Sequence, residues 1–285
     1  MPVPPHSPRT QLDGDVYVLV PSWSDAEPTL LLRYRAAADT WESVDVPTAT
    51  PISGLLATDD RIVVYSGSDE RGEVADLSFD PDLGTWSEMP ADPLSPSFDR
   101  HYAWDGEKLH LFAKDITPSP GGESGPSVTR AAVLHQNGTW EQLPTGTDTL
   151  GFWASITHRG RLVAPQLGCA DGGEVNNYGR CIPYGGVFDT TSQTWKPLPN
   201  KPFVGQRDVQ SAGAFTADEV LLTAHRGHML DLTTDTWIEL PAIDGDAQDR
   251  TIQRTLAGAG RYGFAFGGAR FDADPAGTLL DDAWL

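Results

Sequence analysis

Short apolar stretches separated by polar turns recur along the whole chain. In the commonest pattern, small or apolar residues lead into a polar turn and a strongly apolar stretch follows, as in GLLATDDRIVVY at 54–65 and HYAWDGEKLHLF at 101–112. Two such stretches joined by a short turn are typical of a β-hairpin. The turns of five hairpins of this kind fall at Asp59-Asp60, Asp105-Gly106, Arg159-Gly160, Ala217-Asp218 and Ala259-Gly260.

The dipeptide Thr-Trp marks a second kind of hairpin. An apolar residue stands six or seven positions before each of its tryptophans, and turn residues such as DPDLG and QNG fill the interval. Each Thr-Trp therefore starts the second strand of a hairpin. Asn137-Gly138 fits the positive φ angles of a type I′ turn, so we expect that turn there. The five tryptophans are Trp41, Trp86, Trp140, Trp195 and Trp237.

Together the two hairpins form a repeated four-stranded antiparallel unit, whose strands we call a, b, c and d in chain order. The tryptophans of successive units are 45, 54, 55 and 42 residues apart. Four-stranded units that repeat at about 50 residues are typical of β-propeller blades. A blade has two apolar faces, which neighbouring blades in a ring cover. We therefore expect the repeated tryptophans to lie between neighbouring blades.

These units resemble the Kelch-repeat family, which includes the galactose-oxidase-like propellers. The resemblance covers nearly the whole chain and rests on the Thr-Trp pairs, on FDTTSQTWKPLP at 188–199, AWDGEKLHLF at 103–112 and FAFGGARF…TLLDDAWL at 264–285. The Gly-Gly doublet that the family carries after strand b is present here only at Gly267-Gly268. The resemblance implies that the d-to-a crossovers and the b-to-c loops surround the mouth of a central channel, where ligands bind.

The predicted fold is all-β: a single domain, 1–285, forming a six-bladed Kelch-like propeller. By the resemblance, DDAW at 281–284 belongs to strand c, so the last blade is incomplete or is closed by the N-terminal segment. MPVPPHSP at the start matches MPADPLSP at 89–96 in five positions, and 1–9 is therefore interpreted as a ring-closing crossover. The predicted blades span roughly 10–46, 51–90, 97–144, 150–199, 208–241 and 251–285.

Composition narrows the possible partners. The formal charge of −20, from 40 acidic and 20 basic residues, repels phosphates and argues against nucleic acid. No apolar run approaches the about 18 residues of a transmembrane helix. Cys169 and Cys181 flank a Gly- and Asn-rich loop, where a disulfide would add roughly 3 kcal/mol. A disulfide implies an oxidising compartment, so we expect an exported bacterial protein, extracellular or at the cell surface, whose leader is not among these residues.

Two long loops and a set of arginines form the candidate binding site. The loops are the b-to-c connections at 114–130 and 165–186, and the arginines stand where each strand a begins. Arginine binds carboxylates in a bidentate manner. Alternatively, these arginines pair with the local acids Asp99, Asp208 and Asp249, and Trp153 packs between blades. The candidate ligand-binding residues are Arg100, Arg207, Arg250, Arg254, Trp153, Tyr178 and Tyr184.

No cofactor or metal is expected from the sequence. His225 and His228 could begin a metal site, but no third ligand is evident. The leading hypothesis is a surface binding module for a small anionic, sugar-like or peptide ligand, with binding preferred over catalysis. A metal-free sugar epimerase resembling the bacterial sialate mutarotases, or another Kelch-type enzyme, is the second hypothesis. The third is a purely structural domain of a larger surface protein.

Overall fold

The strands that the sequence pattern predicts are present as antiparallel sheets. The structure is a computed structural model that describes residues 8–21, 28–47, 52, 54–115, 129–143, 156–158, 161–164, 186–197, 199, 213–217, 220–225, 228–231, 234–239, 251–252, 255–259, 262–266, 269–270, 278–279 and 283–284. Within these ranges all strand pairs are antiparallel and no helix occurs, which confirms the all-β prediction. Nor do they include a helix long and apolar enough to cross a membrane.

Five sheets repeat the order a, b, c, d. Sheet 1 contains β1 (Arg9–Leu12), β2 (Asp15–Val20), β3 (Leu30–Arg35) and β4 (Thr40–Asp45). Sheet 2 contains β5 (Gly54–Ala57), β6 (Ile62–Tyr65), β8 (Leu77–Asp80) and β9 (Thr85–Glu88). Sheet 3 contains β10 (Ser97–Trp104), β11 (Leu109–Asp115), β12 (Thr129–Leu134), β13 (Trp140–Gln142) and an additional short strand, β7 (Ser68–Asp69).

The C-terminal half continues the same plan. Sheet 4 contains β14 (Ile156–His158), β15 (Arg161–Ala164), β16 (Gly186–Asp189) and β17 (Thr194–Pro197). Sheet 5 contains β18 (Gly213–Ala217), β19 (Val220–His225), β20 (His228–Asp231) and β21 (Thr236–Glu239). Sheet 6 contains β23 (Thr255–Ala259), β24 (Tyr262–Phe266) and β27 (Ala283–Trp284), and a small sheet contains β22 (Thr251–Ile252), β25 (Ala269–Arg270) and β26 (Thr278–Leu279).

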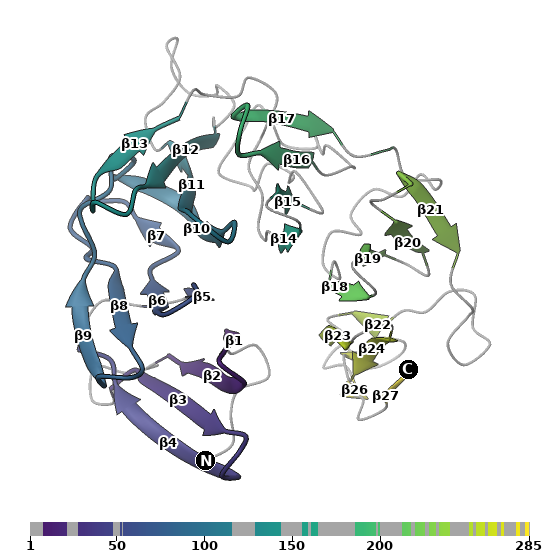
Figure 1. The fold of residues 1–285 in the computed structure, drawn as a ribbon, viewed down its shortest axis with the longest axis horizontal. Coiled ribbons are helices and arrows are strands. Elements are labelled where there is room, and N and C mark those ends of the chain that lie inside the picture. The colour runs from purple at the N-terminus through teal and green to yellow at the C-terminus, as the bar shows by residue number, and fades with distance from the viewer. Residues whose placement is uncertain are drawn as a thin grey trace.

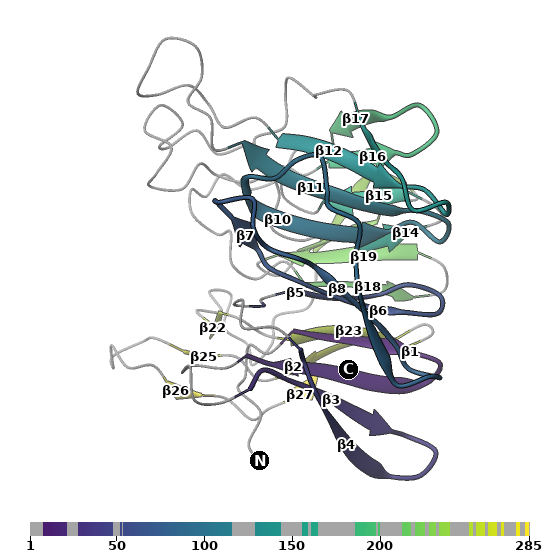
Figure 2. The same cartoon turned by 90° about the vertical axis from the view of Figure 1, so that its left-hand side faces the viewer.

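The sheets follow one another around a common centre (Figure 1). The first strand of each sheet lies innermost, and the Thr-Trp strands β4, β9, β13, β17 and β21 lie outermost. The short strands β7, β22, β25 and β26 gather at one end of the sheets, on the left in Figure 2. We call this the loop end; among the described residues it includes the b-to-c segment 66–76 and the crossover 89–96.

Apolar side chains from neighbouring sheets form the cores between them. One cluster joins Leu19 and Leu31 of sheet 1 to Ile62 and Phe79 of sheet 2. A second joins sheets 2 and 3, and a third joins sheets 3 and 4, where Phe112 and Phe188 meet at 5.7 Å between ring centroids. Because each sheet presents one apolar face to each neighbour, burial of apolar area holds successive sheets together.

Two of the five Thr-Trp tryptophans pack in these interfaces, and one is exposed. Trp86 and Trp140 pack against the clusters between sheets 1 and 2 and between sheets 2 and 3. The indole Nε1 of Trp237 donates to the carbonyl oxygen of Pro199 at 3.3 Å, and the side chain of Trp195 lies outside the described residues. Trp41, however, is 57% exposed. The prediction of burial between blades is therefore wrong for Trp41, whose face of sheet 1 points away from sheet 2.

The c-to-d turns also differ from the predicted type. A type I′ turn needs positive φ at both central residues, but at Asn137-Gly138 only Gly138 has it, at 80°. Each residue before a Thr-Trp adopts this left-handed conformation: Asp39, Gly84, Gly138, Gln193 and Asp235. The backbone N–H of Gly138 donates to the carbonyl of His135 at 2.9 Å, as in a type I turn followed by a left-handed residue.

The two ends of the chain bear on the prediction that the last blade is incomplete or is closed by the N-terminal segment. The segment with Trp284 forms the third strand of sheet 6, pairing with β24. Arg9 already lies in β1, one residue earlier than the predicted blade, and the carbonyl of Pro8 accepts a bond from Leu19 N. The interpretation of 1–7 as a crossover falls on residues outside the described ranges.

Candidate functional site

One of the predicted ligand-binding residues, Arg100, lies in the described part of the chain. It stands in β10, in a bulge where the pairing with β11 shifts register between Phe98 and His101. The backbone N–H of Arg100 donates instead to the carbonyl of Gly67 at 2.9 Å, on the b-to-c segment of sheet 2. Bulges re-aim side chains and are common next to active sites. Outside the described residues lie Arg207, Arg250, Arg254, Trp153, Tyr178, Tyr184, Cys169 and Cys181.

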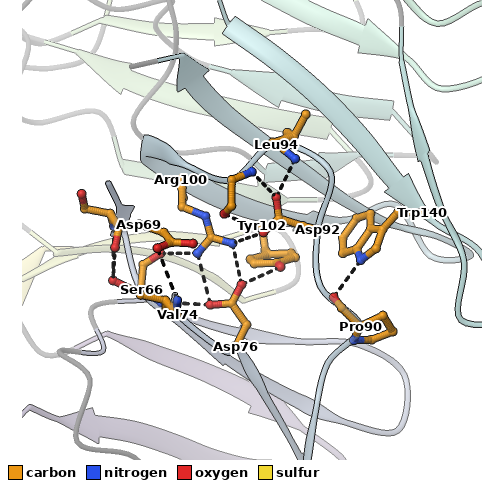
Figure 3. Close-up of polar contacts among 12 residues, drawn as sticks. Ser66, Asp69, Val74, Asp76, Pro90, Asp92, Leu94, Arg100, Tyr102 and Trp140 are labelled. Atoms are coloured by element: carbon orange, nitrogen blue, oxygen red, sulfur yellow. Dashed lines mark hydrogen bonds and ion pairs between the residues drawn. The ribbon is translucent and has the colours of Figure 1, made fainter. Parts of the chain in front are cut away.

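The side chain of Arg100 is fully buried between two carboxylates (Figure 3). Its Nη2 lies 2.7 Å from Asp76 Oδ2 and 2.7 Å from Asp92 Oδ2, and its Nη1 lies 3.2 Å from Asp76 Oδ1. Nη1 also donates to the carbonyl of Ser66 at 3.0 Å. We call Arg100, Asp76, Asp92, Ser66 and Tyr102 the Arg100 cluster.

The two carboxylates extend the cluster into the surrounding loops. The Tyr102 hydroxyl donates to Asp76 Oδ2 at 2.7 Å, and the backbone N–H of Ser66 donates to Asp76 Oδ1. Asp92 Oδ1 accepts bonds from the backbone N–H groups of the crossover residues 94 and 95. The cluster therefore fastens segment 66–76, the crossover 89–96 and strand β10 to one another.

Electrostatics keep Arg100 charged inside the protein. Burial alone would lower the pKa of Arg100, but the hydrogen bond and the charge of Asp76 outweigh it and raise the pKa. Burial and then the charge of Asp76 raise the pKa of Tyr102 as well. The prediction that Arg100 contacts a ligand is not supported by this geometry, because a buried guanidinium between two carboxylates has no surface for an anion. The alternative interpretation, in which these arginines pair with nearby acids, describes Arg100, and the acids are Asp76 and Asp92. The side chain of Asp99 lies outside the described residues.

Next to this cluster, Tyr65 and His101 meet at the inner edge of sheets 2 and 3. The Tyr65 hydroxyl and His101 Nδ1 share a hydrogen bond of 3.3 Å, and the two rings lie edge to face. Tyr65 is 5% exposed, whereas His101 is half-buried on the innermost strand β10. We call Tyr65 and His101 the inner pair.

Burial makes both members of the inner pair neutral. It lowers the pKa of His101 to about 4 and raises the pKa of Tyr65 to about 12. The Tyr65 oxygen also takes a hydrogen bond from the backbone of Tyr102. A neutral imidazole has one N–H donor and one acceptor nitrogen, and its tautomer decides which member of the inner pair donates. The inner pair is thus a hydrogen-bonded pair of uncharged side chains.

Gly54 creates the space that Tyr65 occupies. Gly54 is the partner of Tyr65 in the β5–β6 ladder, and a Cβ at this position would overlap the phenol ring. The ring therefore lies across the innermost strand of sheet 2, towards His101. Sequence reasoning missed this site, because a glycine in a strand signals a close approach without naming the approaching residue.

Replacing Gly54 by alanine is expected to displace Tyr65 and to lower the free energy of unfolding by about 1–3 kcal/mol, the cost of overpacking. Urea denaturation of the wild type, Gly54→Ala, Tyr65→Ala and the double variant measures this effect. In the Tyr65→Ala background the added methyl group has room, so its cost should disappear. An equal cost in both backgrounds would show that Tyr65 does not fill the space over Gly54.

The other candidate residues are placed differently. His225 and His228 are backbone partners in the β19–β20 ladder, and no group of three or more potential metal ligands occurs among the described residues. His110 lies buried with its Nε2 2.8 Å from Asp105 Oδ2. Asp105 Oδ1 also accepts two backbone N–H bonds within its own turn, so this pair stabilises the a-to-b turn of sheet 3.

Comparison with known proteins identifies the fold. No family model matches the sequence, and no curated protein matches it. Among solved structures, the chain is similar to YjhT, with a TM-score of 0.58 and 12% identity over 98% of this chain and 93% of that chain. Virginiamycin B lyase from Staphylococcus aureus gives a TM-score of 0.46 and 11% identity over 91% and 90% of the chains. Both are β-propeller proteins, and at this level of identity the likeness to YjhT shows the fold alone: a β-propeller.

Proposed function

We propose that the protein is a binding module whose ligand contacts the loop end at the inner pair. The observation that carries this proposal is the hydrogen-bonded Tyr65 and His101, placed on the inner edge of two sheets and held there by the Arg100 cluster. Polar groups that are fixed by a rigid scaffold suit binding, because little conformational freedom is lost when the ligand arrives.

The chemistry of the inner pair favours a sugar-like ligand over an anion. A neutral imidazole and a neutral phenol hydrogen-bond to hydroxyl groups, and their rings offer an apolar surface. Arg100, the described arginine of the predicted anion site, is occupied by Asp76 and Asp92. A second group of ligand contacts around the mouth of the central channel remains part of the proposal. Its residues are Arg207, Arg250, Arg254, Trp153, Tyr178 and Tyr184.

A broader set of expectations accompanies this function. We propose a six-bladed Kelch-like ring whose last blade, sheet 6, is completed by another segment. We also propose export to an oxidising compartment, with Cys169 and Cys181 joined as a disulfide. Thiol labelling of the unfolded protein before and after reduction tests the disulfide, and labelling without reduction would contradict it.

Catalysis by the inner pair is the second candidate function, because a phenol bonded to an imidazole resembles an acid–base pair. An efficient general acid or base has a pKa near the working pH. The pKa values of His101, about 4, and Tyr65, about 12, lie far from neutrality on either side. The inner pair is therefore better suited to bind a sugar than to move its protons.

Calorimetric titration with neutral sugars (galactose, glucose, N-acetylglucosamine) and acidic sugars (galacturonate, N-acetylneuraminate) tests the proposal. We expect a neutral sugar to bind and His101→Ala to weaken it by about tenfold, the loss of roughly one hydrogen-bonding contact. His135→Ala, which changes a partly exposed histidine on a turn, is the matched control. Binding of acidic sugars that depends on Arg254 and not on His101 would contradict the proposal, and absence of binding would favour the structural role.

A further inference from the structure

One face of sheet 1 is built like an interface but is exposed at its outer strand, at Trp41. On the side away from sheet 2, this face contains Leu32 and Tyr34 of β3 and Trp41 of β4, which is the ladder partner of Tyr34. The ring centroids of Tyr34 and Trp41 lie 5.0 Å apart, with an angle of 39° between the ring planes. Phe79 and Trp86 in sheet 2 have almost the same arrangement, at 4.9 Å and 42°. We call Leu32, Tyr34 and Trp41 the Trp41 face.

In sheets 3 and 5 the preceding crossover contacts the tryptophan on the same face, whereas the buried indole N–H of Trp86 in sheet 2 has no such partner. In sheet 3, Nε1 of Trp140 donates to the carbonyl of Pro90 at 3.0 Å, a contact drawn in Figure 3. In sheet 5, Trp237 makes the corresponding bond to Pro199. In both sheets the segment that leads into the innermost strand thus passes over the tryptophan of the outermost strand. The Trp41 face differs, because Trp41 is 57% exposed.

The sequence supplies a segment of the matching kind for sheet 1. Pro90 lies seven residues before Ser97, where β10 begins, and Pro2 lies seven residues before Arg9, where β1 begins. Between them, MPVPPHSP and MPADPLSP agree at five positions. Pro8, the last residue of MPVPPHSP, lies beside β2, because its carbonyl accepts a hydrogen bond from the backbone N–H of Leu19.

We propose that residues 1–7 bind across the Trp41 face, with the carbonyl of Pro2 accepting the hydrogen bond of the Trp41 indole. Proline has no N–H to leave unsatisfied and a restricted backbone, so little entropy is lost on docking. The contact satisfies the indole N–H and removes the largest exposed aromatic side chain of the described residues from water, which together favour docking. The inference does not depend on the proposed ligand.

Hydroxyl-radical footprinting of the full chain and of a variant lacking residues 2–7 tests this contact. We expect Trp41 oxidation to rise several-fold in the truncated protein, while oxidation of Trp86, which packs between sheets 1 and 2, stays constant. Equal oxidation of Trp41 in both proteins would overturn the proposal. Protection of Trp41 that depends on protein concentration would also overturn it, because a second copy would then cover the face.

A thermal double-mutant cycle gives a second, independent reading. Truncation and Trp41→Ala should each lower the melting temperature by about 3 °C, and their combination should lower it by about 3 °C as well, since both remove one contact. Leu83→Ala changes an exposed residue on sheet 2, and its effect on the melting temperature should add to that of truncation. Additive effects of truncation and Trp41→Ala would contradict docking of the segment on this face.

Discussion

Replacing Arg100 with methionine is expected to lower the free energy of unfolding by about 3–5 kcal/mol. Methionine retains much of the side-chain volume, but it leaves the carboxylates of Asp76 and Asp92 inside the protein without the cation that both contact. An uncompensated buried charge costs more than the intact pair contributes, since its desolvation is no longer offset. Urea denaturation followed by tryptophan fluorescence measures the loss.

Two further variants make this expectation specific. Arg71→Met removes an exposed arginine from the same b-to-c segment and should change stability by less than about 0.5 kcal/mol. Combining Arg100→Met with Asp76→Asn and Asp92→Asn removes all three charges and should recover part of the loss. If Arg100→Met costs less than about 1 kcal/mol, the cluster does not fasten the loop end as the geometry indicates.

Repetition in the sequence explains why the overall plan was predictable. Each Thr-Trp follows a turn residue with positive φ and begins an outer strand, so local turn chemistry and strand alternation agree. The predicted hairpins 54–65 and 101–112 correspond to β5–β6 and β10–β11. Where the expected turn type was wrong, at Asn137-Gly138, the strands still paired, because one left-handed residue is enough to return the chain.

The candidate site was less predictable, because its residues meet only after the sheets stack. Asp76 and Asp92 are separated in sequence by two strands and a turn, and Arg100 follows in β10. Arginine next to an acid at position 99 suggested a local pair, but from the bulge in β10 the Arg100 side chain reaches Asp76 on the b-to-c segment of sheet 2 and Asp92 on the crossover. The contact between Tyr65 and His101 likewise depends on the missing Cβ of Gly54.

Trp41 shows the limit of reasoning from repeats. Its local sequence is that of the other units, and the ring pair with Tyr34 forms as it does in sheet 2. Its burial, however, depends on what lies against the face of sheet 1 that points away from sheet 2, and the sequence of the unit itself does not specify that neighbour. The same residue pattern therefore gives a packed tryptophan in sheet 3 and an exposed one in sheet 1.

Lowering the pH from 6.5 to 4 is expected to remove about 3 kcal/mol of stability through His101 alone. An unfolded histidine titrates near pH 6.5, whereas burial lowers the pKa of His101 to about 4. Between these values the unfolded chain binds a proton that the folded chain does not. The contribution of His101 is therefore complete above pH 6.5 and is lost as the pH falls towards 4.

Comparison of His101→Gln with the wild type isolates this effect from the titration of the acidic residues. Glutamine stays neutral, so only the wild type loses stability through this position. Between pH 7 and pH 4 its unfolding free energy should fall by about 3 kcal/mol relative to that of the variant. A difference that is constant with pH would mean that the folded protein accepts a proton on His101 as readily as the unfolded chain. The inner pair would then be charged in mild acid, and the preference for a neutral sugar-like ligand would lose its electrostatic basis.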